Sequence, residues 1–166
     1  MDVLVNCAGT NTPERFWRDQ SAKGWRQVIA TNMDSIFYTT HAVLPAMRAR
    51  RSGLVINVSS WAGVHHPKLT GPAYNGSKHA VVAMTETINM EDGVHGIRAC
   101  SLCPAEVATP ILDTRPTPPT AEERARMLQP DDVGRAIRFM AELPAGVCIN
   151  QLVISPTWNR FYINDL

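Results

Sequence analysis

The chain has 166 residues, 45% of them hydrophobic, and a formal net charge of +1. This length fits one domain, and the small charge argues against nucleic acid or an anionic membrane as a partner. No apolar run reaches the roughly 18 residues of a membrane-spanning helix, and no basic start precedes an apolar stretch as in a secretory signal. Four cysteines are typical of a reducing compartment, so we expect a cytoplasmic protein.

Strands and helices are expected to alternate along the chain. Short strands are predicted at 3–5, 54–59, 97–102 and 148–154, and helices at 25–50, 72–91, 120–127 and from 130 onward. Loops separate them at 61–71 and 104–119. Such alternation predicts an α/β fold built on a parallel sheet.

Tyr74 and Lys78 form the most informative pair in the sequence. They lie four residues apart in a predicted helix and therefore share one face. A neighbouring ammonium group favours the phenolate, so we expect Lys78 to lower the pKa of Tyr74 and let it move a proton near neutral pH. Ser59 and Ser60 end the preceding strand, where a hydroxyl could hold the oxygen of an alcohol or ketone beside the tyrosine.

Four further segments accompany this pair in order. They are a strand end at 1–9, a helix at 25–37 that carries Asn32, a serine-ended strand at 54–60 and a proline turn at 103–109. Together with Tyr74 and Lys78, they resemble the short-chain dehydrogenase/reductase family over residues 1 to about 113. Cys7, Ser35 and Ala105 depart from its motifs by small substitutions, and its glycine-rich phosphate-binding turn has no counterpart here.

This resemblance implies both a fold and a reaction. The fold is the C-terminal part of a doubly wound, Rossmann-like parallel sheet with helices on both faces, with residues 1–166 as a single partial domain from strand 4 onward. The reaction is hydride transfer between NAD or NADP and a small alcohol or carbonyl substrate. The resemblance also implies a homodimer or homotetramer in which the two long helices pair. Partly polar positions on these otherwise apolar helices are expected at such an interface, namely Tyr38, His41, Thr85 and Asn89.

The resemblance assigns catalytic roles to four side chains. Tyr74 is the general acid/base, and Lys78 lowers its pKa and binds the nicotinamide ribose. Ser60, preferred over Ser59 from the family spacing, hydrogen-bonds the substrate oxygen. Asn32 holds a water that extends a proton relay from the lysine.

The resemblance also implies a cofactor site made from two strand ends. Asn6, Ala8 and Gly9 line the adenosine side of NAD or NADP, and the residues that flank the nicotinamide are Pro104, Val107 and Thr109. The proline-rich segment 110–130 is long enough to cover a substrate. The residue that distinguishes NAD from NADP has no counterpart in this sequence.

Two other functions stay open. One is a non-catalytic truncated fragment or interaction module of the same fold, because the phosphate-binding turn is missing. The other is a serine hydrolase in which Ser59 or Ser60 acts with His65, His66 or His79, although the sequence lacks the G-x-S-x-G elbow.

No metal site is predicted. His65 and His66 have no third ligand at a suitable spacing. Cys100 and Cys103 lie three residues apart on a predicted strand, which places them on opposite faces.

Overall fold

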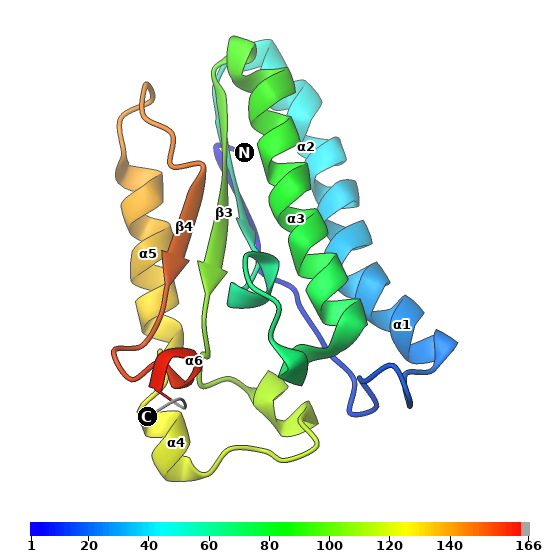
Figure 1. The fold of residues 1–166 in the computed structure, drawn as a ribbon. Coiled ribbons are helices and arrows are strands. Elements are labelled where there is room, and N and C mark those ends of the chain that lie inside the picture. The colour runs from blue at the N-terminus through cyan, green and yellow to red at the C-terminus, as the bar shows by residue number, and fades with distance from the viewer. Residues whose placement is uncertain (164–166) are drawn as a thin grey trace.

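The computed structural model describes residues 1–163, which form a four-stranded parallel sheet in the order β1-β2-β3-β4 (Figure 1). The strands are β1 (Val3–Asn6), β2 (Gly53–Val58), β3 (Ile97–Pro104) and β4 (Gln151–Ile154). This arrangement confirms the α/β class and the parallel sheet. β1 forms one edge, and the central strands β2 and β3 are almost entirely buried.

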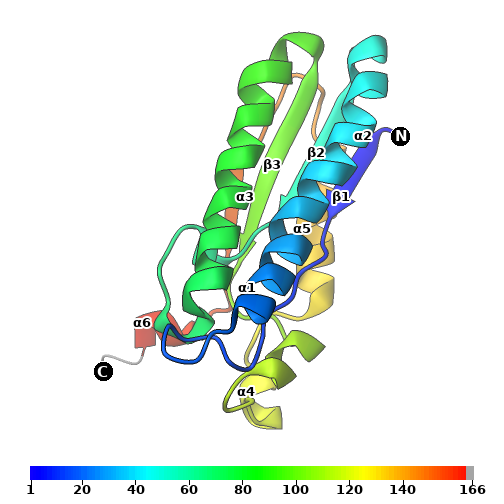
Figure 2. The same cartoon turned by 90° about the vertical axis from the view of Figure 1, so that its right-hand side faces the viewer.

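Helices cover both faces of the sheet (Figures 1 and 2). They are α1 (Ala22–Ile29), α2 (Ser35–Arg50), α3 (Gly71–Asp92), α4 (Ala121–Ala125), α5 (Pro130–Glu142) and α6 (Arg160–Ile163). The long helices α2 and α3 lie side by side on one face, and α5 lies on the other. Within residues 1–163, no helix is both long and apolar enough to cross a membrane.

The alternation of side chains along β2 explains the two layers. Leu54, Ile56 and Val58 point to one face and pack with Met140 of α5. Val55 points to the other face, where apolar residues of α2 and α3 cover it. A strand buried on both faces reads as a continuous apolar run, which is why the sequence predicted it well.

The predicted helix at 25–50 differs from the observed one. The helical segment begins earlier, at Ala22, because the Ser21 hydroxyl accepts a hydrogen bond from the Gly24 amide (3.0 Å) and caps it. It is also interrupted by a π-helical turn at Ala30–Asp34, between α1 and α2. Such turns frequently mark functional positions, and this one carries Asn32.

Two of the four residues expected at a subunit interface face the sheet instead. Tyr38 is 66% exposed and His41 is exposed on α2. Thr85 is fully buried, and its hydroxyl accepts a hydrogen bond from Asn57 of β2 (2.9 Å). Asn89 hydrogen-bonds the backbone of β3. The expectation is therefore wrong for Thr85 and Asn89, because their side chains hydrogen-bond to the strands beneath α3.

Candidate active site

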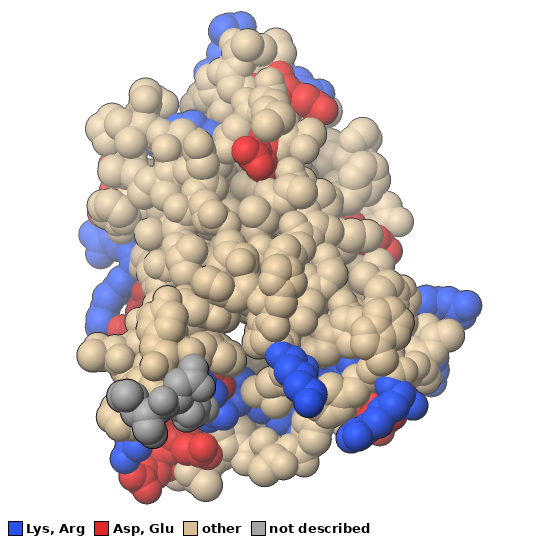
Figure 3. Space-filling view, in the orientation of Figure 1, with Lys and Arg blue, Asp and Glu red and all other residues tan. Residues whose placement is uncertain are grey.

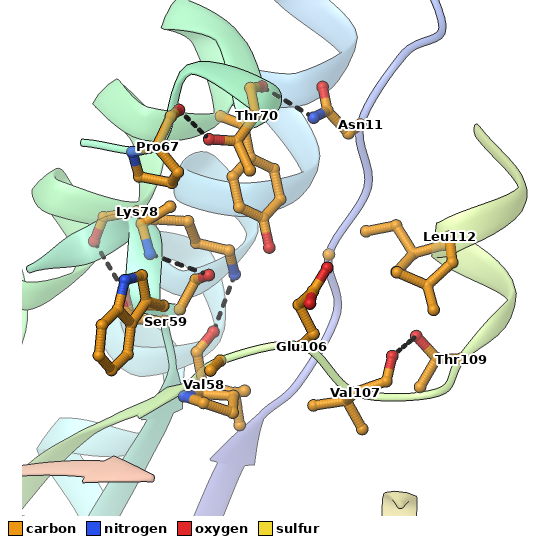
Figure 4. Close-up of a pocket in the computed structure, with 18 of the residues that line it drawn as sticks. Asn11, Val58, Ser59, Pro67, Thr70, Lys78, Glu106, Val107, Thr109 and Leu112 are labelled. Carbon is orange, nitrogen blue, oxygen red and sulfur yellow. Dashed lines mark hydrogen bonds between the residues drawn. The ribbon is translucent and has the colours of Figure 1, made fainter. Parts of the chain in front are cut away.

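A cavity of about 450 Å³ lies at the carboxyl edge of the sheet. Its lining comes from the segments that follow β1, β2 and β3, from the start of α3 and from residues 104–115 (Figure 4). Parallel strands end at a common edge, and ligands of open α/β sheets bind outside that edge. The cavity therefore occupies the position at which this fold binds small molecules.

Tyr74 and Lys78 come from α3 and both line this cavity. Lys78 Nζ lies 5.7 Å from the centroid of the Tyr74 ring, as expected for residues one turn apart on one face. Lys78 is only 3% exposed, and its Nζ donates a hydrogen bond to the Val58 carbonyl at the end of β2 (2.9 Å; Figure 4). The structure thus brings the predicted pair to the end of the predicted strand.

The pKa values of this pair differ from the expectation. Burial raises the pKa of Tyr74, against a hydrogen bond with Ser60 and the charges of Arg115 and Arg15, which lower it. Burial lowers the pKa of Lys78 from 10.5 to about 8. The net shift of the Tyr74 pKa is therefore opposite to the predicted one, because desolvation of the phenolate outweighs the charges that favour it.

The two serines have different environments. The buried Ser59 hydroxyl donates a hydrogen bond to the Lys78 carbonyl (2.8 Å) and thereby ties the end of β2 to α3. Ser60 lines the cavity together with Tyr74, lowers the pKa of that phenol, and accepts a hydrogen bond from the Ala62 amide (3.1 Å). Ser60 is consequently the serine that is placed to contact a ligand beside Tyr74.

Asn32 is fully buried beneath the cavity. Its side-chain oxygen accepts a hydrogen bond from the Thr10 amide (2.8 Å), and its Nδ2 donates to the Thr10 carbonyl (3.0 Å) and to Ser77 of α3 (3.1 Å). A Cβ atom on Gly9 would lie 3.5 Å from Lys78 Nζ and 3.9 Å from Asn32 Oδ1. Asn32 and Lys78 therefore both lie close to Gly9 in the loop that follows β1.

The three residues expected on the adenosine side occupy different places. Gly9 lines the cavity, and Ala8 is exposed next to it. Asn6 is buried, donates a hydrogen bond to Asn57 of β2 (2.8 Å) and accepts one from Thr39 of α2 (2.8 Å). Asn6 thus connects β1 to its neighbours.

The turn after β3 supplies the opposite side of the cavity. Pro104, Val107 and Thr109 all line it, and Figure 4 labels Val107 and Thr109. The Val107 carbonyl accepts hydrogen bonds from the amide (2.8 Å) and the hydroxyl (3.5 Å) of Thr109. A β-bridge between Val107 and Leu128 holds this turn against the start of α5. The turn is therefore a fixed part of the wall rather than a free loop.

Four charged side chains at the cavity were not singled out by the sequence analysis. Arg15, Glu106 and Arg115 line it, and Arg160 of α6 forms an ion pair with Glu106 (2.7 Å). Arg115 pairs with the same carboxylate (2.8 Å). Arg15 and Arg115 lie 100 positions apart in the sequence, so no local sequence pattern predicts that both line one cavity. The predicted cover from 110 onward is partly present, because Pro110, Ile111, Leu112 and Arg115 line the cavity.

The histidines and cysteines take structural positions. The ring of His65 stacks on Trp61 (4.1 Å between centroids), and His66 stacks on His79 (4.6 Å). Among residues 1–163, no hydrogen bond joins a histidine to Ser59 or Ser60, so the serine-hydrolase arrangement is not formed. Burial raises the pKa of Cys100 to about 12 and also raises that of Cys103, which disfavours the thiolate that a metal ion requires.

The family model for short chain dehydrogenases matches residues 1–119. The chain therefore belongs to the short-chain dehydrogenase family. The glycine-rich turn of the family has no counterpart in it, and the chain spans less than two thirds of the length of the first relatives that it matches.

Individual relatives agree with this assignment. An oxidoreductase of Staphylococcus saprophyticus is 34% identical over 164 residues, which cover 95% of this chain and 65% of that protein. The L-fucose dehydrogenase of Bos taurus is 34% identical over 152 residues, or 85% of this chain and 56% of that protein. The closed form of a serine dehydrogenase complexed with NADP+ superposes with a TM-score of 0.86 at 30% identity and covers 94% of this chain and 65% of that one.

Proposed function

We propose that this protein is an NAD(P)-dependent oxidoreductase that interconverts a small alcohol and its carbonyl compound, with Tyr74 as the acid/base. The observation that carries this proposal is the convergence of Tyr74, Ser60 and Lys78 on one cavity at the strand ends. Membership of the short-chain dehydrogenase family supports it.

The residues fit the nicotinamide end of the cofactor. Gly9 leaves an open approach to Lys78 Nζ, where a side chain would stand 3.5 Å away, and an ammonium group can donate hydrogen bonds to ribose hydroxyls. Pro104, Val107 and Thr109 form the facing wall. When bound there, the nicotinamide supplies the hydride that the protein itself cannot supply.

The raised pKa of Tyr74 decides its form at neutral pH. The phenol keeps its proton and can therefore give it to the oxygen of a carbonyl substrate as the carbonyl carbon receives the hydride. Ser60 donates to the same oxygen and stabilises the charge that develops on it. In the reverse direction Tyr74 accepts the alcohol proton, and the nearby charges of Arg15 and Arg115 favour that ionised state.

Lys78 and Asn32 complete the proposed site. Lys78 holds the ribose and supplies a positive charge beside Tyr74, and its pKa of about 8 leaves it mainly protonated at neutral pH. Asn32 orders the loop after β1 against α3 and would hold a relay water next to Lys78.

The wider properties belong to the same proposal. Residues 1–166 form part of one Rossmann-like domain, and the cofactor is NAD or NADP. The protein acts in the cytoplasm on a small molecule, as a homodimer or homotetramer. The exposed Tyr38 and His41 of α2, and the neighbouring exposed Phe37, support a contact between copies through this helix.

The test is cofactor oxidation by a version of the chain extended at its N-terminus with the glycine-rich segment of the family, which is called the full-length protein below. NADH and NADPH absorbance would be followed with a panel of ketones and aldehydes, for wild type, Tyr74→Phe and the control Tyr38→Phe. We expect turnover in wild type and the control and its loss in Tyr74→Phe. Equal turnover by folded Tyr74→Phe would reject Tyr74 as the proton donor.

A binding measurement separates the enzyme from the non-catalytic alternative. We expect the full-length protein to bind NADH or NADPH in calorimetry. We expect residues 1–166 alone to bind weakly, with a dissociation constant above about 1 μM, because the chain lacks a glycine-rich phosphate cradle. Absence of binding by the full-length protein would favour the interaction module.

A further inference from the structure

The cavity beside Tyr74 carries an excess of positive charge. Among the described residues that line it, the cationic ones are Arg15, Lys78 and Arg115, and the single acidic one is Glu106. With Lys78 protonated, these groups sum to +2, whereas the whole chain has a formal charge of only +1. On the face of the molecule drawn in Figure 3, Lys and Arg side chains gather in and around a hollow in the lower half. Such a concentration of charge attracts anions.

Arg15, like Lys78, is a cation that is only 3% exposed and has no acidic partner among residues 1–163. Its Nε donates to the Thr12 carbonyl (2.8 Å), and its Nη2 donates to the carbonyl and the hydroxyl of Thr114 (2.9 Å to the hydroxyl). No acceptor for its Nη1 is found in the described part of the chain. A buried guanidinium normally faces a carboxylate or phosphate.

Arg115 is the second cation of this wall, and Glu106 neutralises it only in part. The Glu106 carboxylate is shared between Arg115 (2.8 Å) and Arg160 (2.7 Å), and Arg160 also contacts Glu123 (3.5 Å). Arg15 and Arg115 line the same cavity as Tyr74, and their charges lower the pKa of its phenol. Arg15, Arg115 and Glu106 together carry a charge of +1, so one further negative charge at this wall would balance these three side chains.

We propose that Arg15 and Arg115 bind an anionic group of the substrate, a carboxylate or a phosphate ester, and so orient its carbonyl toward Tyr74. This inference rests on the proposed oxidoreductase function and names its substrate class. The apolar lining from Leu69, Ile111 and Leu112 then receives the remainder of a small molecule. Arg15 and Arg115 are binding residues in this scheme and take no part in proton transfer.

A purely structural role for Arg15 makes a different prediction. Its bonds to Thr114 fasten the loop 110–115 to the segment that follows β1. Loss of that fastening would weaken the use of charged and neutral substrates alike. Loss of an anion site would weaken only the charged ones. The ratio between a charged compound and its neutral counterpart therefore distinguishes the two roles.

The experiment measures kcat and KM of the full-length protein with two matched pairs. Acetoacetate and methyl acetoacetate differ by a carboxylate, and dihydroxyacetone phosphate and dihydroxyacetone differ by a phosphate. We expect kcat/KM to favour the charged member of one pair by about tenfold to a hundredfold, mainly through a lower KM. A preference of this size corresponds to the free energy of one charge-assisted hydrogen bond. The pair that shows the preference identifies the anion.

Four variants assign the effect. Arg15→Gln and Arg115→Gln should each lower the preference about tenfold or more. Arg138→Gln removes an equal charge from the exposed side of α5 and should leave the preference for the charged substrate unchanged. Thr114→Val removes a hydroxyl that accepts from Arg15 but keeps the guanidinium, and should also retain the preference. The affinity for NADPH should be the same in all four.

Several results would overturn the inference. Equal use of charged and neutral members leaves the oxidoreductase function standing and rejects the anion site. The anion site is also rejected if the preference for the charged substrate survives in both arginine variants, or if Thr114→Val removes that preference as completely as the arginine variants do. A parallel fall in NADPH affinity would assign the arginines to the cofactor. If none of the four compounds turns over, calorimetry decides: binding of a charged member that Arg15→Gln abolishes supports the site, and its absence rejects it.

Discussion

The two walls of the cavity are built in different ways. The helix wall, made of the end of β2, the residues that directly follow it and the start of α3, carries Tyr74 and Lys78 on α3 and Ser60 two residues after β2. Hydrogen bonds between α3 and the end of β2 hold it together. The loop wall, made of residues 104–115 together with Arg15, has little regular structure and is held by ion pairs and side-chain bonds to backbone carbonyls. Rigid elements can position reacting groups within a fraction of an ångström, whereas loops can vary without disturbing the core.

This difference predicts a division of effects. Changes to the helix wall should alter the rate of the chemical step or the stability of the fold. Changes to the loop wall should alter the choice of substrate. The four predictions that follow all concern the helix wall and complement the substrate-preference experiment on the loop wall.

The largest effect is expected from Tyr74→Phe. The ring packing stays, but the transferable proton is removed, so kcat should fall by about 10²- to 10⁴-fold. The free energy of unfolding should change by less than about 1.5 kcal/mol, because the hydroxyl faces the cavity and could contribute at most about one hydrogen bond to the fold. Steady-state kinetics and urea unfolding measure the two quantities. A loss of stability as large as the loss of activity would argue for a structural tyrosine.

The two serines should separate activity from stability. Ser60→Ala removes the hydroxyl beside Tyr74, and kcat should fall by about 10²-fold, as for the loss of one donor to a developing oxyanion. Ser59→Ala removes the hydrogen bond to the Lys78 carbonyl and should lower the free energy of unfolding by about 1 kcal/mol. The reverse pattern would show that Ser59 is the substrate-binding residue.

Two glycines test how tightly the helix wall is packed. A Cβ at Gly63 would lie 2.3 Å from Ser59 Oγ and 2.7 Å from the Lys78 carbonyl oxygen, so Gly63→Ala should destabilise the fold by about 1–3 kcal/mol. Gly76→Ala is the matched control on α3, where no atom lies within 4 Å, and should stabilise by about 0.5–1 kcal/mol. Thermal unfolding compares them. Equal melting temperatures would mean that this contact is loose.

The smallest effect concerns pH. Native Lys78 loses its proton at a pKa of about 8, whereas an unfolded lysine keeps it to 10.5. The unfolded state therefore binds more protons between these values, and the free energy of unfolding rises with pH in that window. Relative to Lys78→Met, wild type should gain on the order of 1–3 kcal/mol from pH 8 to 10.5. Urea titrations would show it, and parallel curves for the two proteins would contradict it.

Local sequence determined the elements and the chemical core of the site. The apolar runs of β2 and β3 and the four-residue spacing of Tyr74 and Lys78 depend on periodicities that neighbouring residues carry themselves. The order of strand and helix then placed Ser60 beside that pair, because a parallel strand must deliver its carboxyl end to the edge where the next helix begins.

Tertiary structure decided the properties that depend on burial and on distant partners. The pKa of Tyr74 is raised rather than lowered because the fold removes water from the phenolate, which the spacing of Lys78 does not reveal. The side chains of Thr85 and Asn89 point toward the sheet because they form hydrogen bonds with polar groups of β2 and β3 beneath α3. Arg15 meets Thr114 across 99 positions, and only the folded chain brings these loops into contact and creates the positively charged wall.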